Sequence, residues 1–356
     1  MSKTLWVSTR KGLFELIRKA DEWHVARLSH RGVPVTQTLV DRRDSTVYAA
    51  LDHGHFGTKL QRSDDGGVTW TELAAPAFPD GTDVSAGAIW ALTAGGVDQP
   101  GRVWAGGLPG GLFRSDDRGD TWALVTGLWQ REEKGHWFGG GADLPALHTV
   151  LVDPNDSRHV TVAVSCGGVW QSHDDGDSWA ITAAGMRAEY MPPDRADDPR
   201  IQDPHRLAAC PVDPSRVWCQ HHNGVFRSDD GGQTWLELSE RVTPSAFGFA
   251  VVVHPTDPDK AWFVPAVKDE ERIPVGGSLV VAHTRDGGHT FVEQRVGLPQ
   301  VHAYDLVYRH AMDIDLVGAQ LAFGSTTGNL FVTGDGGETW RLALGHLPPI
   351  YAVCFA

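Results

Sequence analysis

The chain has 356 residues, a formal net charge of −14 at pH 7 and a sequence pI of about 5.6. It contains no run of Lys and Arg, so nucleic acid is not an expected partner, because phosphate binding needs a basic surface. No apolar run reaches the roughly 18 residues of a membrane span, and the first residues lack the apolar stretch of a secretory signal. Most of the four cysteines lie in apolar strand-like segments, so we expect a reduced, cytoplasmic protein without a membrane partner.

Three strand-like segments open the chain, at residues 4–8, 12–17 and 22–28. This opening unit is one strand short of a four-stranded sheet. At the other end, Ile350–Phe355 reads as a strand that no later segment can pair with. We predict that this last strand completes the opening unit as its innermost strand, because that pairing leaves no open sheet edge.

Between these ends one pattern, Ser/Thr-x-Asp-x-Gly-x-x-Trp/Phe, recurs six times, and its closing aromatic residues are spaced 52, 57, 56, 56 and 49 residues apart. Each copy lies between two strand-like segments. We therefore expect a hairpin turn in which Asp accepts backbone hydrogen bonds, Gly adopts a positive φ and the aromatic ring is buried. A period of this size indicates propeller blades of four strands. Together with the opening unit, it predicts an all-β, seven-bladed β-propeller that forms a single domain over residues 1–356. The copies begin at Ser63, Ser115, Ser172, Ser228, Thr284 and Thr333.

This pattern resembles the Asp-box, or BNR, repeat of sialidase-like, sortilin-like and YVTN-type repeat proteins, of xyloglucanases and of the photosystem II assembly factor. The resemblance covers nearly the whole chain and implies the propeller fold. It implies no single activity, because these relatives do unrelated things. A true sialidase is not expected, because the Arg-Ile-Pro element of sialidases precedes the first repeat, whereas Arg272-Ile273-Pro274 occurs late in this chain. The xyloglucanase resemblance implies a cleft between two propellers, whereas this sequence supplies a single propeller.

The repeats also give every residue a place on one of two faces. The repeat turns lie on one face, so the loops between second and third strands and the links between blades lie on the other, which we call the top face. Eight of the 17 histidines map to the top face. His148 and His205 stand at matching strand starts in neighbouring blades, and His222 lies on the loop beside the second of them. We predict that these three bind a transition metal (Zn, Cu, Fe or Mn) or a reacting substrate. The alternative is that they are polar side chains that plug the channel.

Charged and aromatic residues in the same loops complete the candidate site. For each of them the structural alternative, a solvated charge or a ring that packs its own loop, stays open. The candidate catalytic residues are Glu189, Tyr190, Asp269, Glu270 and Arg272. The candidate substrate-binding residues are Arg10, His53, His55, Trp129, His136, Trp137, His221 and His302.

These observations predict an enzyme with a His-rich axial pocket on the top face. A metal-assisted hydrolase or lyase fits best, because a metal ion can activate water without a Ser or Cys nucleophile. Its substrate would be a small molecule or a carbohydrate-like glycoside. The alternative is a propeller without catalytic activity that binds a ligand or serves as an assembly scaffold.

Overall fold

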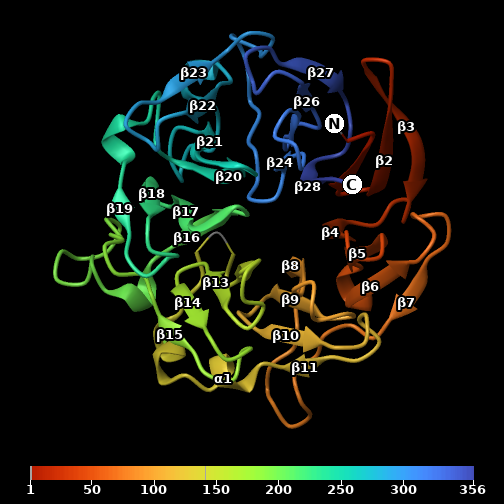
Figure 1. Cartoon of the computed structure of the whole chain (residues 1–356), viewed down its shortest axis with the longest axis vertical. Helices are drawn as coiled ribbons and strands as arrows, with labels where there is room; N and C mark the ends of the chain where they lie inside the picture. The colour runs from red at the N-terminus through yellow and green to blue at the C-terminus, as the bar shows by residue number, and fades with distance from the viewer. Residues whose placement is uncertain (1, 141) are drawn as a thin grey trace. The chain divides into compact units, whose positions relative to one another are not determined.

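The computed structural model describes residues 2–140 and 142–356 and contains seven four-stranded sheets with antiparallel neighbours (Figure 1). The predicted all-β, seven-bladed β-propeller is thereby confirmed. The chain divides into two compact units. Residues 2–35, 205–231 and 236–356 form the first unit, and residues 36–204 and 232–235 form the second. The single domain over residues 1–356 stays a prediction.

The first unit holds four sheets. In hydrogen-bonded order, the N-terminal sheet consists of β28 (Ile350–Phe355), β1 (Thr4–Thr9), β2 (Gly12–Lys19) and β3 (Glu22–Ser29). The strands of the other three sheets are hydrogen-bonded in chain order. One consists of β16 (Pro204–Cys210), β17 (Asp213–His221), β18 (Val225–Ser228) and β19 (Leu236–Glu237). The other two are β20 (Gly248–His254), β21 (Asp257–Pro265), β22 (Val281–Thr284) and β23 (Val292–Gln294), then β24 (Met312–Ile314), β25 (Leu321–Gly324), β26 (Leu330–Thr333) and β27 (Arg341–Leu344).

The second unit holds the remaining three sheets, whose strands are also hydrogen-bonded in chain order. The first consists of β4 (Val35–Asp41), β5 (Thr46–Asp52), β6 (Thr58–Ser63) and β7 (Thr71–Leu73). The second consists of β8 (Ile89–Ala94), β9 (Val103–Gly107), β10 (Leu112–Ser115) and β11 (Ala123–Leu124). The third consists of β12 (Leu147–Val152), β13 (Val160–Val164), β14 (Gly168–Ser172) and β15 (Ala180–Ile181).

Helices are few and short in the described residues. One is the α-helix α1 (Thr126–Trp129), and the others are 3₁₀ turns. None of the helices in the described part of the chain is long and apolar enough to cross a membrane. The 3₁₀ turns are η1 (Gly54–Phe56), η2 (Glu132–His136), η3 (Pro199–Ile201), η4 (Ser239–Arg241) and η5 (Val275–Gly277).

The second strand of a sheet is covered on both faces, and its sequence reflects this. All five residues of β9 and of β13 are buried, so these strands read as continuous runs of apolar and small residues instead of alternating polar and apolar positions. The fourth strands are different. β11, β15 and β19 have two residues each, and both residues of β19 are exposed. These sheets therefore place their apolar side chains at the inner strands and end at a short edge, whereas the N-terminal sheet ends at the eight-residue strand β3.

The last strand completes the N-terminal sheet, as predicted. β28 pairs antiparallel with β1, and Figure 1 shows it beside the N-terminal strands. Ile350 and Phe355 are fully buried at its two ends, and the Phe355 ring lies 6.1 Å from that of Trp23 in β3. These rings belong to the apolar core of the first unit.

The repeat turns form the predicted hairpin geometry. In the turn that begins at Ser115, the serine hydroxyl donates to Asp117 Oδ1 (2.8 Å) and accepts from the Gly119 amide (2.8 Å). The carboxylate of Asp117 accepts from the amide (2.8 Å) and the hydroxyl (2.6 Å) of Thr121. Gly119 adopts a φ of +88°, and its carbonyl accepts from the indole of Trp122 (3.1 Å). The Asp of the repeat thus has a structural role, because it closes its own turn.

Truncation of Phe355 tests the closing strand. Phe355→Ala is expected to lower the free energy of unfolding by about 3–5 kcal/mol, because the ring is fully buried. Leu342→Ala, on the exposed outer strand β27, is the control and is expected to change stability by less than about 0.5 kcal/mol. Chemical denaturation measures both. Equal effects of the two variants would contradict a structural role for the β28–β1 pairing.

Acid should destabilise the repeat turns. The pKa values of Asp65, Asp174 and Asp286 are lowered to about 2, mainly by hydrogen bonds from the Thr or Ser four residues later. Because the folded pKa lies below the ordinary value of 3.8, this stabilisation is complete above about pH 4 and is lost as the pH falls towards 2. Denaturation midpoints between pH 5 and pH 2 measure it. Asp65→Asn should flatten the profile, whereas Asp80→Asn, at an exposed loop position, should leave it unchanged.

Candidate functional site

Two of the predicted metal-binding histidines lie together in the first unit. His205 is the second residue of β16, and His222 follows β17 on the loop to β18. Their ring centroids are 5.5 Å apart at an interplanar angle of 76°. His205 is 2% exposed and stacks on Phe249 at 4.4 Å and 13°, while Phe247 meets both imidazoles edge-on. The two histidines therefore share one wall of aromatic rings, and we call this group the His205–His222 cluster.

A backbone carbonyl fixes the tautomer of His205. Its Nδ1 lies 2.6 Å from the carbonyl oxygen of Gly248. A carbonyl only accepts hydrogen bonds, so Nδ1 carries the proton and the lone pair of the neutral ring is on Nε2. This arrangement, with one ring nitrogen anchored to the backbone, is typical of histidines that bind metal ions.

The two imidazoles suit a transition metal. Imidazole nitrogens are ligands that Zn²⁺ and Fe²⁺ prefer in proteins, so His205 and His222 can supply two of the ligands that such an ion needs.

His148, the third predicted ligand, is held by other partners. It is fully buried in the second unit, where Nε2 lies 2.7 Å from the carbonyl of Pro204 and Nδ1 lies 3.0 Å from the hydroxyl of Thr149. Since the carbonyl requires a proton on Nε2, Nδ1 is the nitrogen that accepts from Thr149. Both nitrogens are used in this way. His148 therefore fits the polar-plug alternative and is not one of the ligands that we propose.

Two arginines lie against the aromatic wall of the His205–His222 cluster. The guanidinium carbons of Arg272 and Arg309 lie 5.4 Å and 5.3 Å from the ring centre of Phe249, a distance at which a cation is attracted to the ring. Arg272 comes from the long loop between β21 and β22, where it pairs with Asp269. Asp269 and Arg272 were candidates from the sequence, whereas Phe249 and Arg309 were not, because no motif or loop length marks these two residues.

Other predicted residues of the first unit lie elsewhere. His221 is fully buried, and its Nδ1 accepts from the amide of Asn223 (3.1 Å), so its ring closes its own loop. Glu270 is exposed, 3.6 Å from the ammonium group of Lys268. Arg10 and His302 are exposed on two further loops. Roles of these four residues in catalysis or substrate binding stay predictions.

In the second unit, the predicted aromatic residues pack against other parts of the same unit. Trp137 is buried 5.9 Å from Trp170, and Trp129 lies beneath the ammonium group of Lys134, at 3.8 Å. The hydroxyl of Tyr190 donates to the carbonyl of Ile201 (2.8 Å), and burial raises its pKa above the ordinary value. These contacts fit the loop-packing alternative, and the binding or catalytic roles stay predictions.

The remaining predicted residues of the second unit are on its surface. His136 is exposed and lies 2.9 Å from the guanidinium group of Arg200. His53 precedes the η1 turn, His55 lies in it, and Glu189 is exposed. Nothing in the described contacts tests whether these residues meet a substrate.

Comparison with known proteins gives relatives in sequence over part of the chain. No protein-family model matches it. An oligoxyloglucan-reducing end-specific xyloglucanase from Emericella nidulans is 26% identical over 218 residues, which is 53% of this chain and 25% of that enzyme. The xyloglucanase Xgh74A from Acetivibrio thermocellus is 26% identical over 150 residues, which is 35% of this chain and 16% of that enzyme. The chain thus matches a quarter or less of the length of these curated relatives.

Solved structures are similar over nearly the whole chain. The GH74 xyloglucanase from Xanthomonas campestris aligns with a TM-score of 0.68 and 16% identity, covering 96% of this chain and 53% of that one. YCF48 from Cyanidioschyzon merolae aligns with a TM-score of 0.57 and 12% identity, covering 94% and 96%. At such identities the likeness shows the fold alone, and that fold is the seven-bladed β-propeller.

Proposed function

We propose that this protein is a metal-dependent hydrolase or lyase whose metal ion is held by His205 and His222. The observation that carries the proposal is the approach of the two imidazoles, whose ring centroids are 5.5 Å apart. The hydrogen bond from His205 Nδ1 to the Gly248 carbonyl supports it, because it leaves the lone pair of the neutral ring on Nε2.

When bound, such an ion supplies Lewis-acid catalysis and lowers the pKa of water. The residues around it would orient the substrate. Arg272 and Arg309, beside Phe249, offer positive charge to an anionic or strongly polar group of the substrate. Phe247 and Phe249 offer apolar rings that exclude water from one side.

We propose a carbohydrate-like molecule as the substrate, and glycoside hydrolysis as the reaction to test first. The partial sequence similarity to two xyloglucanases supports this choice. The six repeat turns, with their shared Ser/Thr, Asp and Gly positions, support assignment to the BNR/Asp-box repeats. The alternative function, a propeller that binds a protein or peptide without catalysis, is favoured by the nearly full-length alignment with YCF48.

Elemental analysis of protein purified without an affinity tag tests the metal site. We expect a stoichiometric transition metal in the wild type. His205→Ala and His222→Ala should each lower the metal affinity by more than the roughly 10–100-fold that follows from changing a group that only orients a ligand. His24→Ala, at an exposed histidine without a proposed role, is the matched control and should keep the metal.

Activity is measured on xyloglucan oligosaccharides with the metal-loaded protein. We expect cleavage to disappear in His222→Ala and to persist in His24→Ala. Metal-free wild-type protein that cannot be loaded with Zn²⁺, Fe²⁺ or Mn²⁺ would overturn the metal site. In that case, binding without turnover would favour the scaffold alternative.

A further inference from the structure

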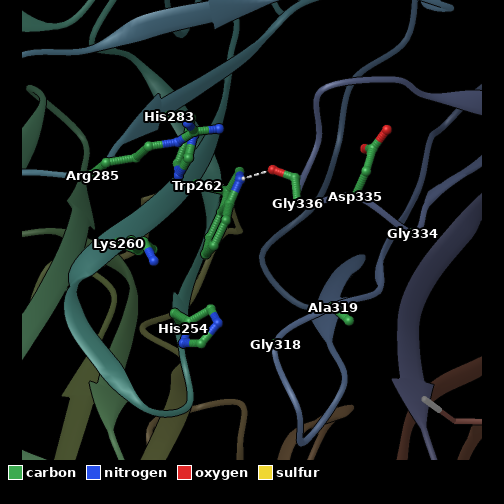
Figure 2. Close-up of a pocket in the computed structure, with 10 residues that line it drawn as sticks. All are labelled: His254, Lys260, Trp262, His283, Arg285, Gly318, Ala319, Gly334, Asp335 and Gly336. Carbon is green, nitrogen blue, oxygen red and sulfur yellow. Dashed lines mark hydrogen bonds between the residues drawn. The ribbon is translucent and has the colours of Figure 1, made fainter.

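A pocket of about 440 Å³ lies in the first unit, on the side of the repeat turns. Figure 2 shows that residues of the β20–β23 sheet line one side of it and residues of the β24–β27 sheet line the other. The lining includes two cationic side chains, Lys260 and Arg285, and the imidazoles of His254 and His283. The protein as a whole carries a net charge of −14, so two cations at one pocket need an explanation.

Three other sheets have an arginine latch in the corresponding place. Arg114, directly before the Ser of its repeat, donates to the backbone carbonyl of Asp175 in the next sheet (3.0 Å). It also pairs with Asp116, directly after that Ser, at 3.5 Å. The same two contacts are made by Arg62, with Asp64 and the carbonyl of Arg118, and by Arg227, with Asp229 and the carbonyl of Gly287.

The β20–β23 sheet lacks this latch. His283 pairs with Trp262 in the register in which Arg227 pairs with Trp218, so an imidazole replaces the arginine. Arg285 stands where the three sheets with a latch carry Asp64, Asp116 and Asp229, so the charge there is reversed. The carbonyl that a latch would bind is that of Gly336, and the indole of Trp262 donates to it instead (3.0 Å; Figure 2). The pocket occupies the place left by the missing guanidinium group.

His283 presents a hydrogen-bond donor at this place. It is 4% exposed and stacks on Trp262 at 4.4 Å and 6°. The amide nitrogen of Gln294 donates to the Gly336 carbonyl (3.2 Å) and lies 3.3 Å from His283 Nδ1. Nδ1 is therefore an acceptor, and the proton is on Nε2, which has no hydrogen-bond partner among the described residues. A buried donor of this kind is costly unless something binds to it.

The electrostatics of the pocket favour a negative ligand. Burial, and then the charges of Arg285 and Lys260, lower the pKa of His283 to about 3, so these charges act at the imidazole. The acidic residue among the described lining residues is Asp335, whose carboxylate accepts hydrogen bonds inside its own repeat turn. Lys260 and Arg285 each have one acidic neighbour, Asp257 at 2.8 Å and Glu338, but their side chains are 37% and 57% exposed and can turn to a ligand.

We infer that this pocket binds a tetrahedral oxyanion, phosphate or sulfate, either as the free ion or as the ester group of a larger molecule. Lys260 and Arg285 supply the charge, and the Nε2 proton of His283 supplies a buried donor. The volume of the pocket leaves room for the body of a sugar or nucleotide ester. This inference does not depend on the proposed metal site.

Calorimetric titration with sodium phosphate and sodium sulfate, at constant ionic strength with chloride as the blank, tests the inference. We expect saturable binding at one site. Arg285→Asp introduces the acid that the three sheets with a latch carry at this position. This variant and Lys260→Ala should each weaken binding by at least about tenfold. Lys59→Ala is the matched control, because Lys59 forms a comparable ion pair with Glu72 (2.9 Å) and is similarly exposed (36%).

The double variant His283→Arg/Arg285→Asp rebuilds the latch. It should lose binding while its melting temperature stays equal or rises, which separates loss of the site from loss of the fold. Tighter binding of a hexose phosphate than of free phosphate would identify an ester ligand, whereas equal binding would identify the free ion. An adventitious ion only, meaning equal heats for chloride and phosphate or undiminished binding by Arg285→Asp, would overturn the inference.

Discussion

The N-terminal sheet depends on hydrogen bonds between residues from the two ends of the sequence. A strand with one unpaired edge is a template for association with other chains, and β1 would have such an edge without β28. The contact orders the last strand and buries Ile350 and Phe355 together with Trp23. Because this pairing spans almost the full sequence, it requires the strands between its two ends to be formed.

The sheets could be predicted from the sequence because their turns carry a local chemical signal. A Ser or Thr hydroxyl, an Asp carboxylate and a Gly at fixed spacing satisfy the backbone of one hairpin, so the pattern is visible without knowledge of distant contacts. The closing strand was predictable for a different reason. The chain opens with three strands and ends with one strand that has no partner, so pairing the last strand with the first three completes a four-stranded sheet.

The candidate site was predictable only in part. The repeat register predicted that His205 and His222 lie together, and their ring centroids are 5.5 Å apart. Phe249 and Arg309 could not be predicted, because the contact of Phe249 with His205 and that of Arg309 with Phe249 depend on the packing of one sheet against another. The substitution of His283 and Arg285 into the repeat was visible in the sequence, but its meaning required the contacts of Arg114 and Arg227 in the equivalent sheets.

The missing latch has a consequence for how a repeat protein diversifies. In a chain of similar units, a contact that recurs at three junctions is partly redundant, so the fold tolerates sheets that lack it. At the junction beside His283, a pocket and two cationic side chains stand where the three latched sheets have an arginine and an acid. A binding site can thus form where one repeat lacks a side chain that fills the same place in other repeats. Comparison of the repeats within one chain is enough to find such a site.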